Sequence, residues 1–517
     1  MFDAKKVKRT ADTIRMLAAD AIQKANSGHP GMPLGCADIA ATLFSSHLRF
    51  QPKNPAWIGR DRFVLSAGHG SMLEYALLHL FGYGLTMDDL KAFRQWGSLT
   101  PGHPEYGHTA GVDITTGPLG SGLSSAVGMA MAEKHFEAVT GLDKAGLELP
   151  RIFVLCGDGC MMEGCTNESA SLAGHLKLDN LIVFYDSNRI TIEGGTDLAF
   201  SEDTAKRYEA MGWRVLEIAD ANDPAQCDAG MTAACASDGR PTLVVCHTAI
   251  GFGAPGKQGK SSAHGEPLGA EEIEAMRQAL GMPEAFTVDA EVQDFCAAVV
   301  ARVTAGAAAW DKAFQSFVEA DADRAKLIAD LLNPQLPENL EEELLQAVTL
   351  DKPAASRATG GQALQKAAAL VPALWGGSAD LAPSNKTDIK NGGDFSAANY
   401  AGKNIHFGVR ELAMGFAGNG MALQGSVIPY TATFFVFSDY LKPAIRLAAL
   451  QKLHELYIFT HDSFYVGEDG PTHEPIEQLA MLRSIPGLTV LRPAEAHEVA
   501  QAYAAALRAD GPVALLL

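Results

Sequence analysis

The sequence is poor in cysteine and lacks a spacing that would bind a structural metal. Its eight cysteines are scattered over 517 residues, with no CxxC pair. A disulfide framework or a zinc site is therefore not expected, and reduced thiols favour a cytoplasmic location. Three cysteines, at positions 156, 160 and 165, crowd one short stretch, where we interpret them as small packing residues.

Basic charge is also scarce. The chain has 41 Lys and Arg against 61 Asp and Glu, which gives a net charge of −20 at pH 7. This balance argues against nucleic acid or an anionic membrane as a partner. It does not exclude phosphorylated substrates, because local basic clusters can operate inside an acidic protein.

We find no apolar run that would span a bilayer, and the start MFDAKKVKRTADTIR lacks the apolar core of a signal peptide. We therefore expect no membrane association. Hydrophobic residues make up 47% and charged residues 20% of the chain, as in ordinary globular proteins. The length predicts two to four domains, each with its own core.

The sequence pattern of residues 151–190 predicts a strand, a glycine turn, a helix and a second strand. RIFVLC and NLIVFY are short apolar runs typical of strands buried in a parallel sheet. Asp158 and Asn188 follow these strands, at the sheet edge where ligands bind. A carboxylate and an amide oxygen suit Mg²⁺ or Ca²⁺. The GDG sequence around Asp158 is alternatively a plain strand-to-helix turn.

Several histidines occupy glycine- and proline-rich turns rather than helix faces. His29 lies in NSGHPGMPLG, His69 follows a predicted strand in GHGSM, His103 lies in TPGHPE, and His264 lies in a long polar loop. Such loops often carry function. The glycine loop around Gly117, TTGPLGSG, would let an anion approach the backbone, although a tight helix contact needs the same residues.

A second series of strands and helices begins near residue 350. Its predicted strands are LWGGSAD, NIHFGV, SVIPYTAT, ELYIFTHD, LTVLRP and PVALLL. Alternation with helical segments indicates a parallel α/β domain. The predicted fold class is therefore α/β, with two domains that are each a mainly parallel sheet flanked by helices. We place the first domain at 1–325, a linker at 326–350 and the second domain at 351–517.

Together these motifs resemble the transketolase family along nearly the whole chain. The matching stretches, in order, are SGHPG, GHGSM, TPGHPE, TTGPLGSG, GDGCMMEG, GGSADLAPSN, GVRE, YTATFFVFSDY, THDS and GEDGPTHEP. The resemblance implies a diphosphate-binding domain followed by a pyrimidine-binding domain, both with the thiamine diphosphate-binding fold. It also implies transfer of a two-carbon ketol unit from a ketose phosphate (xylulose 5-phosphate) to an aldose phosphate (ribose 5-phosphate) in the pentose phosphate pathway.

The resemblance implies an anchor for thiamine diphosphate. Asp158, Asn188 and the backbone carbonyl of Ile190 would hold Mg²⁺ or Ca²⁺ beside the diphosphate. Glu411, in HFGVRE, would hydrogen-bond the aminopyrimidine ring and help to form the nucleophilic carbon. From the residues alone, the favoured interpretation of Glu411 is an acid stabilised at a helix start.

Further cofactor contacts are implied by the same resemblance. They comprise two loop histidines, small or apolar loop residues and three aromatic residues at three-residue spacing: His69, His264, Gly117, Leu119, Gly159, Phe434, Phe437 and Tyr440. The aromatic residues would stack on the pyrimidine ring, although a helical aromatic stripe is otherwise typical of a core.

On the substrate side, the resemblance implies catalytic and binding histidines, an aspartate that selects sugar stereochemistry and a phosphate-binding group. The histidines are His29, His103, His264 and His473, which we expect to titrate near their ordinary pKa. The aspartate is Asp469, and the phosphate-binding group is Arg357, Ser384 and His461.

Family members build each active site from the first domain of one chain and the second domain of its mate, so a homodimer is implied. They also carry a third domain, preceded by an arginine of the phosphate clamp, whereas this sequence stops at Leu517. We expect that the chain either was cut at the domain boundary or is naturally a two-domain form. Because the arginine of the phosphate clamp is lost, we also expect weaker substrate binding. Alternatives are dihydroxyacetone synthase, deoxyxylulose phosphate synthase or another thiamine diphosphate ketol transferase, and a non-catalytic dimer core that binds cofactor.

Overall fold

The computed structural model describes residues 2–282, 284–349 and 353–517. Its contacts divide the chain into two compact units. The first comprises residues 1–123 and 148–313, and the second comprises residues 124–147 and 314–517. The second unit therefore includes a segment from early in the chain. The predicted domain boundaries stay a prediction.

The first unit is built on a five-stranded parallel sheet with strand order β1-β2-β3-β5-β4. Its strands are β1 (Arg62–Leu65), β2 (Ile152–Gly157), β3 (Leu181–Asp186), β4 (Arg214–Ile218) and β5 (Thr242–Cys246). Nearly every residue of β2 and all of β3 are buried, as their unbroken apolar sequences predict. This confirms the parallel sheet expected from RIFVLC and NLIVFY.

Helices flank this sheet. They are α1 (Ala4–Ala25), α2 (Gly31–Gly35), α3 (Ala37–Thr42), α4 (Ser71–Leu80), α5 (Met87–Lys91), α7 (Asp158–Met162), α8 (Gly164–Leu176), α9 (Thr204–Ala210), α10 (Pro224–Cys235) and α11 (Ala270–Ala279). The Asp3 side chain caps α1 by accepting hydrogen bonds from Lys5 N and Lys6 N. Loops between these elements, rather than the helices themselves, carry His29, His103 and His264.

The second unit contains a six-stranded parallel sheet with strand order β10-β11-β9-β8-β6-β7. Its strands are β6 (Leu374–Ser378), β7 (Asn404–His406), β8 (Ile428–Phe434), β9 (Leu456–Thr460), β10 (Thr489–Leu491) and β11 (Val513–Leu516). All six correspond to strands expected from the sequence. The fold class is confirmed as α/β with two mainly parallel sheets.

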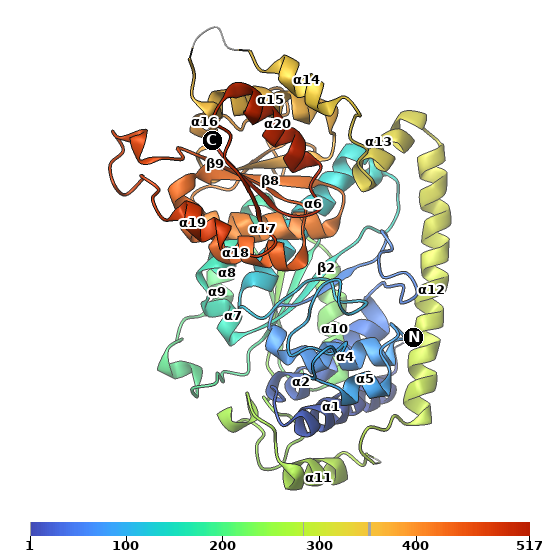
Figure 1. Ribbon diagram of the computed structural model, residues 1–517. Coiled ribbons are helices and arrows are strands. Elements are labelled where there is room, and N and C mark those ends of the chain that lie inside the picture. Colours follow the sequence, from blue (N-terminus) through green and yellow to red (C-terminus); the bar gives the residue numbers. More distant parts are fainter. Residues whose placement is uncertain (1, 283, 350–352) are drawn as a thin grey trace. The chain divides into compact units, whose positions relative to one another are not determined.

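Helices of the second unit are α13 (Ala322–Leu332), α14 (Leu340–Ala347), α15 (Ser356–Leu370), α16 (Ala382–Asn385), α17 (Glu411–Gln424), α18 (Ser438–Gln451), α19 (Gln478–Arg483) and α20 (Ala496–Leu507). In Figure 1, α15 and α20 lie side by side, as do α17 and α18. α6 (Ser121–Thr140) lies mostly in this unit and is buried along almost its whole length.

α6 packs directly against α17. A Cβ atom placed on Gly128 would lie 1.9 Å from the carbonyl oxygen of Ala417, and one placed on Gly420 would lie 1.8 Å from that of Ser125. The two helix backbones therefore touch, which only glycine permits at both positions. Elsewhere on α6, the ring of His135 stacks on Trp375 with centroids 4.3 Å apart.

α12 (Ala290–Glu319) is a 30-residue, alanine-rich helix seen at the edge of Figure 1. By length and composition it could cross a membrane, with 22% of its most apolar window buried in the described chain. This helix differs from the expectation of no membrane-spanning run, because many alanines raise its mean hydropathy without a continuous run of large apolar side chains. Helices of water-soluble proteins meet the same criterion, so it carries little weight. Near the end of α12, Trp310 meets Trp57 edge to face, with centroids 5.6 Å apart.

Candidate functional site

In the first unit, the carboxyl ends of β2 and β3 bring the predicted oxygen ligands together. Gly157 pairs with Asp186, so the residues that follow each strand are neighbours. Asp158 and Asn188 line one cavity of about 280 Å³, which we call the inner cavity. Its other predicted site residues are His29, His69, Gly117, Leu119, Gly159, Ile190 and His264.

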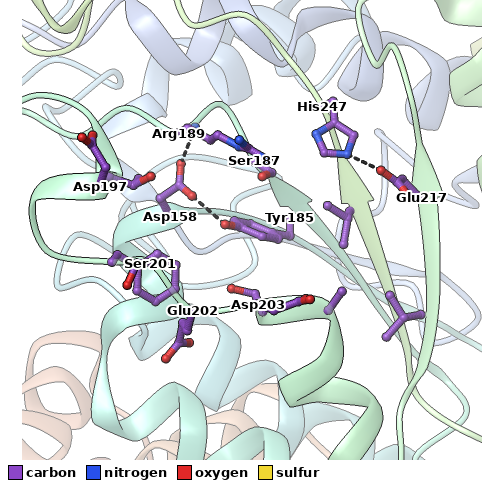
Figure 2. A pocket seen from close by; sticks show the side chains of 16 residues that line it. Asp158, Tyr185, Ser187, Arg189, Asp197, Ser201, Glu202, Asp203, Glu217 and His247 are labelled. Carbon is purple, nitrogen blue, oxygen red and sulfur yellow. Dashed lines mark hydrogen bonds and ion pairs between the residues drawn. The ribbon is translucent and has the colours of Figure 1, made fainter.

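Asp158 is a buried carboxylate with two well-defined donors. The Tyr185 hydroxyl donates to Oδ1 at 2.6 Å, and the Arg189 backbone N–H donates to Oδ2 at 3.0 Å. Figure 2 shows both contacts. Burial raises the pKa of Asp158 to about 6, because a carboxylate loses hydration there. A cation placed beside it would restore that lost stabilisation.

Asn188 is oriented by its neighbours. Its Nδ2 donates to Asp186 Oδ2 at 2.8 Å, and its Oδ1 accepts a hydrogen bond from Ile190 N at 2.9 Å. Asp186 also accepts a hydrogen bond from the Thr248 hydroxyl. Because Asp186 holds the amide nitrogen, the amide oxygen is left as the ligand atom.

These donors fit a hard divalent cation bound together with phosphate. In the part of the chain that the structure describes, no group of three or more His, Cys, Asp or Glu side chains could hold a metal. Asp158, Asn188 and Ile190 offer oxygen instead of nitrogen or sulfur, and they are too few to complete a shell. Such a site fits Mg²⁺ or Ca²⁺ that shares its remaining positions with a phosphorylated ligand.

Four histidines gather in and beside the inner cavity. The ring centroid of His29 lies 5.2 Å from His69, 6.0 Å from His264 and 6.4 Å from His103. Burial lowers the pKa of His29 to about 4 and that of His69 to about 3. It lowers the pKa of His103 and His264 as well. The expectation of ordinary pKa values is therefore wrong for His29, His103 and His264, whose imidazoles burial keeps neutral.

The glycines of the loop TTGPLGSG serve two purposes. Gly117 has φ of +146° and faces the His103 ring, with the nearest atom 3.4 Å from a Cβ built there. Gly122 instead packs against Ser66, whose Cα would lie 2.6 Å from an added Cβ. Gly122 therefore confirms the packing interpretation, whereas Gly117 lines the inner cavity and the approach of an anion to its backbone stays a prediction.

In the second unit, the predicted aromatic residues form a continuous stack rather than one helical stripe. Phe434 ends β8, Phe437 lies in a short 3₁₀ turn, and Tyr440 lies in α18. Phe434 and Phe437 have centroids 6.2 Å apart, and Phe437 and Tyr440 have centroids 5.9 Å apart. Tyr440 is 60% exposed, which argues against a core role.

Arg357, Ser384 and His461 lie together, as expected. Arg357 Nη1 donates a hydrogen bond to His461 Nε2 and lies 3.4 Å from the carbonyl oxygen of Ser384. The His461 ring also packs on Phe434, with centroids 3.8 Å apart. The Arg357 guanidinium is suited to a phosphate, and the contact of His461 with Phe434 joins this group to the aromatic stack.

The remaining predicted residues of the second unit flank this group. His473 meets Phe437 edge to face, with centroids 5.4 Å apart, and Asp469 lies exposed nearby in the same loop. Glu411 is the first residue of α17 and is half-buried in the described chain. The predicted site residues therefore form one set in each unit.

Three polar residues that are not among the predicted site residues contact them. Tyr185 and Asp186 hold Asp158 and Asn188, and an Arg94 Nη2 lies 3.4 Å from His29 Nδ1. Tyr185 and Asp186 end a buried strand. Polar residues are unusual in such a place, so their presence in the sequence could have indicated a functional role. Arg94 has φ of +60°, a strained backbone that no sequence pattern reveals.

Two family models match the chain. The model described as "Transketolase, thiamine diphosphate binding domain" matches residues 6–337, and the one described as "Transketolase, pyrimidine binding domain" matches residues 352–517. Together they cover almost all of the sequence, including both sets of predicted site residues.

Curated relatives and solved structures agree with this match. The transketolase of Bacillus subtilis (strain 168) is 50% identical over 99% of this chain and 77% of its own length. That of Geobacillus stearothermophilus is 52% identical over 98% of this chain and 76% of its own length.

Among solved structures, transketolase from Leishmania mexicana superposes with a TM-score of 0.95 at 42% identity, over 99% of this chain and 76% of that one. A Pichia stipitis transketolase complex with sedoheptulose 7-phosphate superposes with a TM-score of 0.94 at 42% identity, over 99% and 77%. The chain thus spans about three quarters of the length of these proteins.

Proposed function

Because the chain belongs to the transketolase family, we propose that it transfers a two-carbon ketol unit from xylulose 5-phosphate to ribose 5-phosphate. It is a transferase with domains for thiamine diphosphate. The observation that carries the choice of phosphosugars is the group of Arg357, Ser384 and His461 beside the aromatic stack. A cationic guanidinium favours a phosphate dianion over an uncharged sugar end or formaldehyde.

The cofactor, when bound, supplies a nucleophilic carbon that accepts and releases the two-carbon unit. We propose that Asp158, Asn188 and the Ile190 carbonyl hold Mg²⁺ or Ca²⁺ against its diphosphate. Glu411 would hold a proton at the aminopyrimidine ring, and Phe434, Phe437 and Tyr440 would pack on that ring. His69, Gly117, Leu119, Gly159 and His264 would complete the cofactor contacts.

The histidines would act on the sugar. His29, His103, His264 and His473 would donate and accept hydrogen bonds at the sugar oxygens, and Asp469 would select the configuration of a hydroxyl. Burial keeps the first three neutral, which suits groups that exchange a proton with bound substrate. A neutral imidazole can also donate and accept at once.

We further propose that the active form is a homodimer acting in the cytoplasm, within the pentose phosphate pathway. Large apolar side chains are exposed in each unit near its predicted site residues. In the first unit Trp96, Ile192 and Leu198 are exposed, and in the second unit Val409, Tyr440 and Tyr465 are exposed. Such side chains favour burial against a second subunit.

The direct test is to supply thiamine diphosphate, Mg²⁺, xylulose 5-phosphate and ribose 5-phosphate and to measure sedoheptulose 7-phosphate. We expect product with the wild-type chain and a loss of about 100-fold or more with Glu411→Gln. Cofactor binding without product would support a non-catalytic core instead. Faster turnover with formaldehyde than with ribose 5-phosphate would contradict the proposed acceptor.

Asp158→Ala tests the cofactor anchor separately. We expect this variant to keep its fold and to lose retention of thiamine diphosphate, because the carboxylate is the charged ligand of the proposed cation. Circular dichroism would follow the fold, and calorimetry would follow cofactor binding. Tight, metal-dependent binding of the cofactor by Asp158→Ala would contradict the proposed anchor.

A further inference from the structure

Asp158 lies between two cavities rather than in one. Besides the inner cavity, it lines a second cavity of about 810 Å³, which we call the outer cavity. Figure 2 looks into the outer cavity, where Tyr185, Ser187 and Arg189 surround the carboxylate. A carboxylate in this place can turn toward either space, because its terminal torsion is soft.

The outer cavity does not suit a diphosphate. Its lining includes Glu202, Asp203 and Glu217, which repel an anion, and His247 there is engaged by Glu217. Asp158 is useful to an anionic cofactor only when it presents its oxygens to a cation on the inner side. The chain therefore needs a contact that holds the carboxylate in one orientation.

Tyr185 makes that contact. Its hydroxyl donates to Asp158 Oδ1 at 2.6 Å, a short bond typical of an ionised acceptor. Tyr185 lines the outer cavity and is only 4% exposed, so its hydroxyl approaches Asp158 from a nearly dry position. Tyr185 belongs to β3, where it pairs with Cys156 of β2, which lies two residues before Asp158.

The strand context makes this donor rigid. Tyr185 is flanked in register by Cys156 on one side and by Val245 of β5 on the other, so its backbone is fixed by ladders on both sides. The side chain is almost completely buried, and the close packing of a protein interior leaves a buried ring little room to change rotamer. The hydroxyl therefore sits at one place relative to Asp158.

We propose that Tyr185 is a positioning residue that aims the Asp158 carboxylate at the divalent cation and cofactor diphosphate in the inner cavity. This inference rests on the proposed cation site. Tyr185 does not touch the cofactor in this scheme. Its hydroxyl fixes Oδ1 while the Arg189 N–H fixes Oδ2, so the carboxylate is held in one orientation and its remaining lone pairs are left for the cation. Groups that orient metal ligands in this way typically change metal affinity by about 10- to 100-fold.

The test is Tyr185→Phe in the full chain, which removes the hydroxyl and keeps the ring. We expect the Mg²⁺ concentration for half-maximal thiamine diphosphate binding to rise by about 10- to 100-fold, with binding restored at high Mg²⁺. Calorimetry or tryptophan quenching reports this binding directly. The thermal midpoint of the cofactor-free chain should change little.

The matched control is Tyr208→Phe. Tyr208 is also fully buried in the first unit, but its hydroxyl contacts Met161 Sδ at 3.3 Å instead of a carboxylate. We expect this variant to keep the wild-type Mg²⁺ dependence. An equal shift in both variants would mean that loss of any buried hydroxyl weakens the site, and it would overturn the inference.

A double-mutant comparison separates positioning from folding. With Asp158→Asn already present, adding Tyr185→Phe should weaken cofactor binding by less than threefold, because the charged acceptor is gone. The same loss in both backgrounds would assign Tyr185 a purely structural role and overturn the inference, even if the variant is less stable.

The outcomes also separate this inference from the function on which it rests. If wild-type binding of thiamine diphosphate does not depend on a divalent cation, the proposed cation site fails, and the inference fails with it. If wild-type binding depends on Mg²⁺ and Tyr185→Phe shows the same dependence, only the role of Tyr185 is overturned.

Discussion

Glu455 is a carboxylic acid buried completely against the helix that begins with Glu411. It accepts hydrogen bonds from the Thr431 and Tyr457 hydroxyls, both at 3.1 Å, and its carboxylate fills the space that a side chain at Gly418 would occupy. Burial raises the pKa of Glu455 to about 8. The folded chain therefore holds a proton that the unfolded chain releases above a pH of about 4.5.

This difference predicts a pH-dependent stability. Because the pKa is higher in the folded state, the contribution of Glu455 is greatest below the unfolded value of 4.5 and is lost as pH rises toward about 8. A glutamine at position 455 cannot ionise. The thermal midpoint of Glu455→Gln should therefore fall less between pH 4.5 and about 8 than that of the wild type. Thermal unfolding at several pH values checks this, with the exposed Glu342→Gln as control. Parallel curves for Glu455→Gln and wild type would contradict the prediction.

At the level of single residues, the sequence identified the groups that stand out chemically. Asp158, Asn188 and His29 lie in turns after or between predicted elements, and the structure brings them into one cavity. Tyr185 escaped notice because a tyrosine in an apolar strand usually packs in a core. The depressed pKa of His29 was equally hidden, because burial depends on neighbours distant in the sequence.

At the level of elements, the contact between α6 and α17 depends on glycine. Gly420→Ala would place a methyl group 1.8 Å from the Ser125 carbonyl oxygen, so one helix must move. We expect a loss of about 1–3 kcal/mol of stability. Since α17 begins with Glu411, we also expect weaker cofactor binding. Thermal unfolding and calorimetry measure the two effects.

The control for this change is Gly306→Ala. Gly306 lies within α12, and an added Cβ there meets nothing within 4 Å. Alanine is the better helix former, so this variant should be unchanged or more stable by up to about 1 kcal/mol. If Gly420→Ala is as stable as Gly306→Ala, the backbones of α6 and α17 are not in close contact.

Elements were predicted well where the sequence pattern was continuous, and less well where the chain bends. The buried strands β2 and β3 are apolar throughout, which makes them visible in the sequence. The three-residue spacing of Phe434, Phe437 and Tyr440 suggested one helix face. The structure divides them among a strand, a 3₁₀ turn and a helix, because packing sets where β8 ends.

For the whole molecule, the proposed dimer makes a quantitative prediction. If each active site takes Asp158 from one chain and Glu411 from its mate, Asp158→Ala and Glu411→Gln chains are inactive alone but restore one site in each mixed dimer. Random mixing should recover about a quarter of wild-type activity, since half of the dimers are mixed and each has one intact site. The assay is product formation after joint refolding or co-expression.

Its controls are the two variants refolded separately, which should stay inactive. Recovery should vanish when one chain carries both substitutions, because no combination then rebuilds a complete site. Absence of recovery in verified mixed dimers would contradict sites shared between chains. It would favour sites formed within one chain.

The placement of α6 has a consequence for synthesis on the ribosome. α6 is complete by Thr140, but its partner α17 ends at Gln424, about 280 residues later. At about 5–20 residues per second, this nearly all-buried helix waits roughly 15–60 s before α17 has been made. During that interval the face of α6 around Gly128 lacks its native cover from α17, so we expect the newly made chain to depend on chaperones that shield apolar surface.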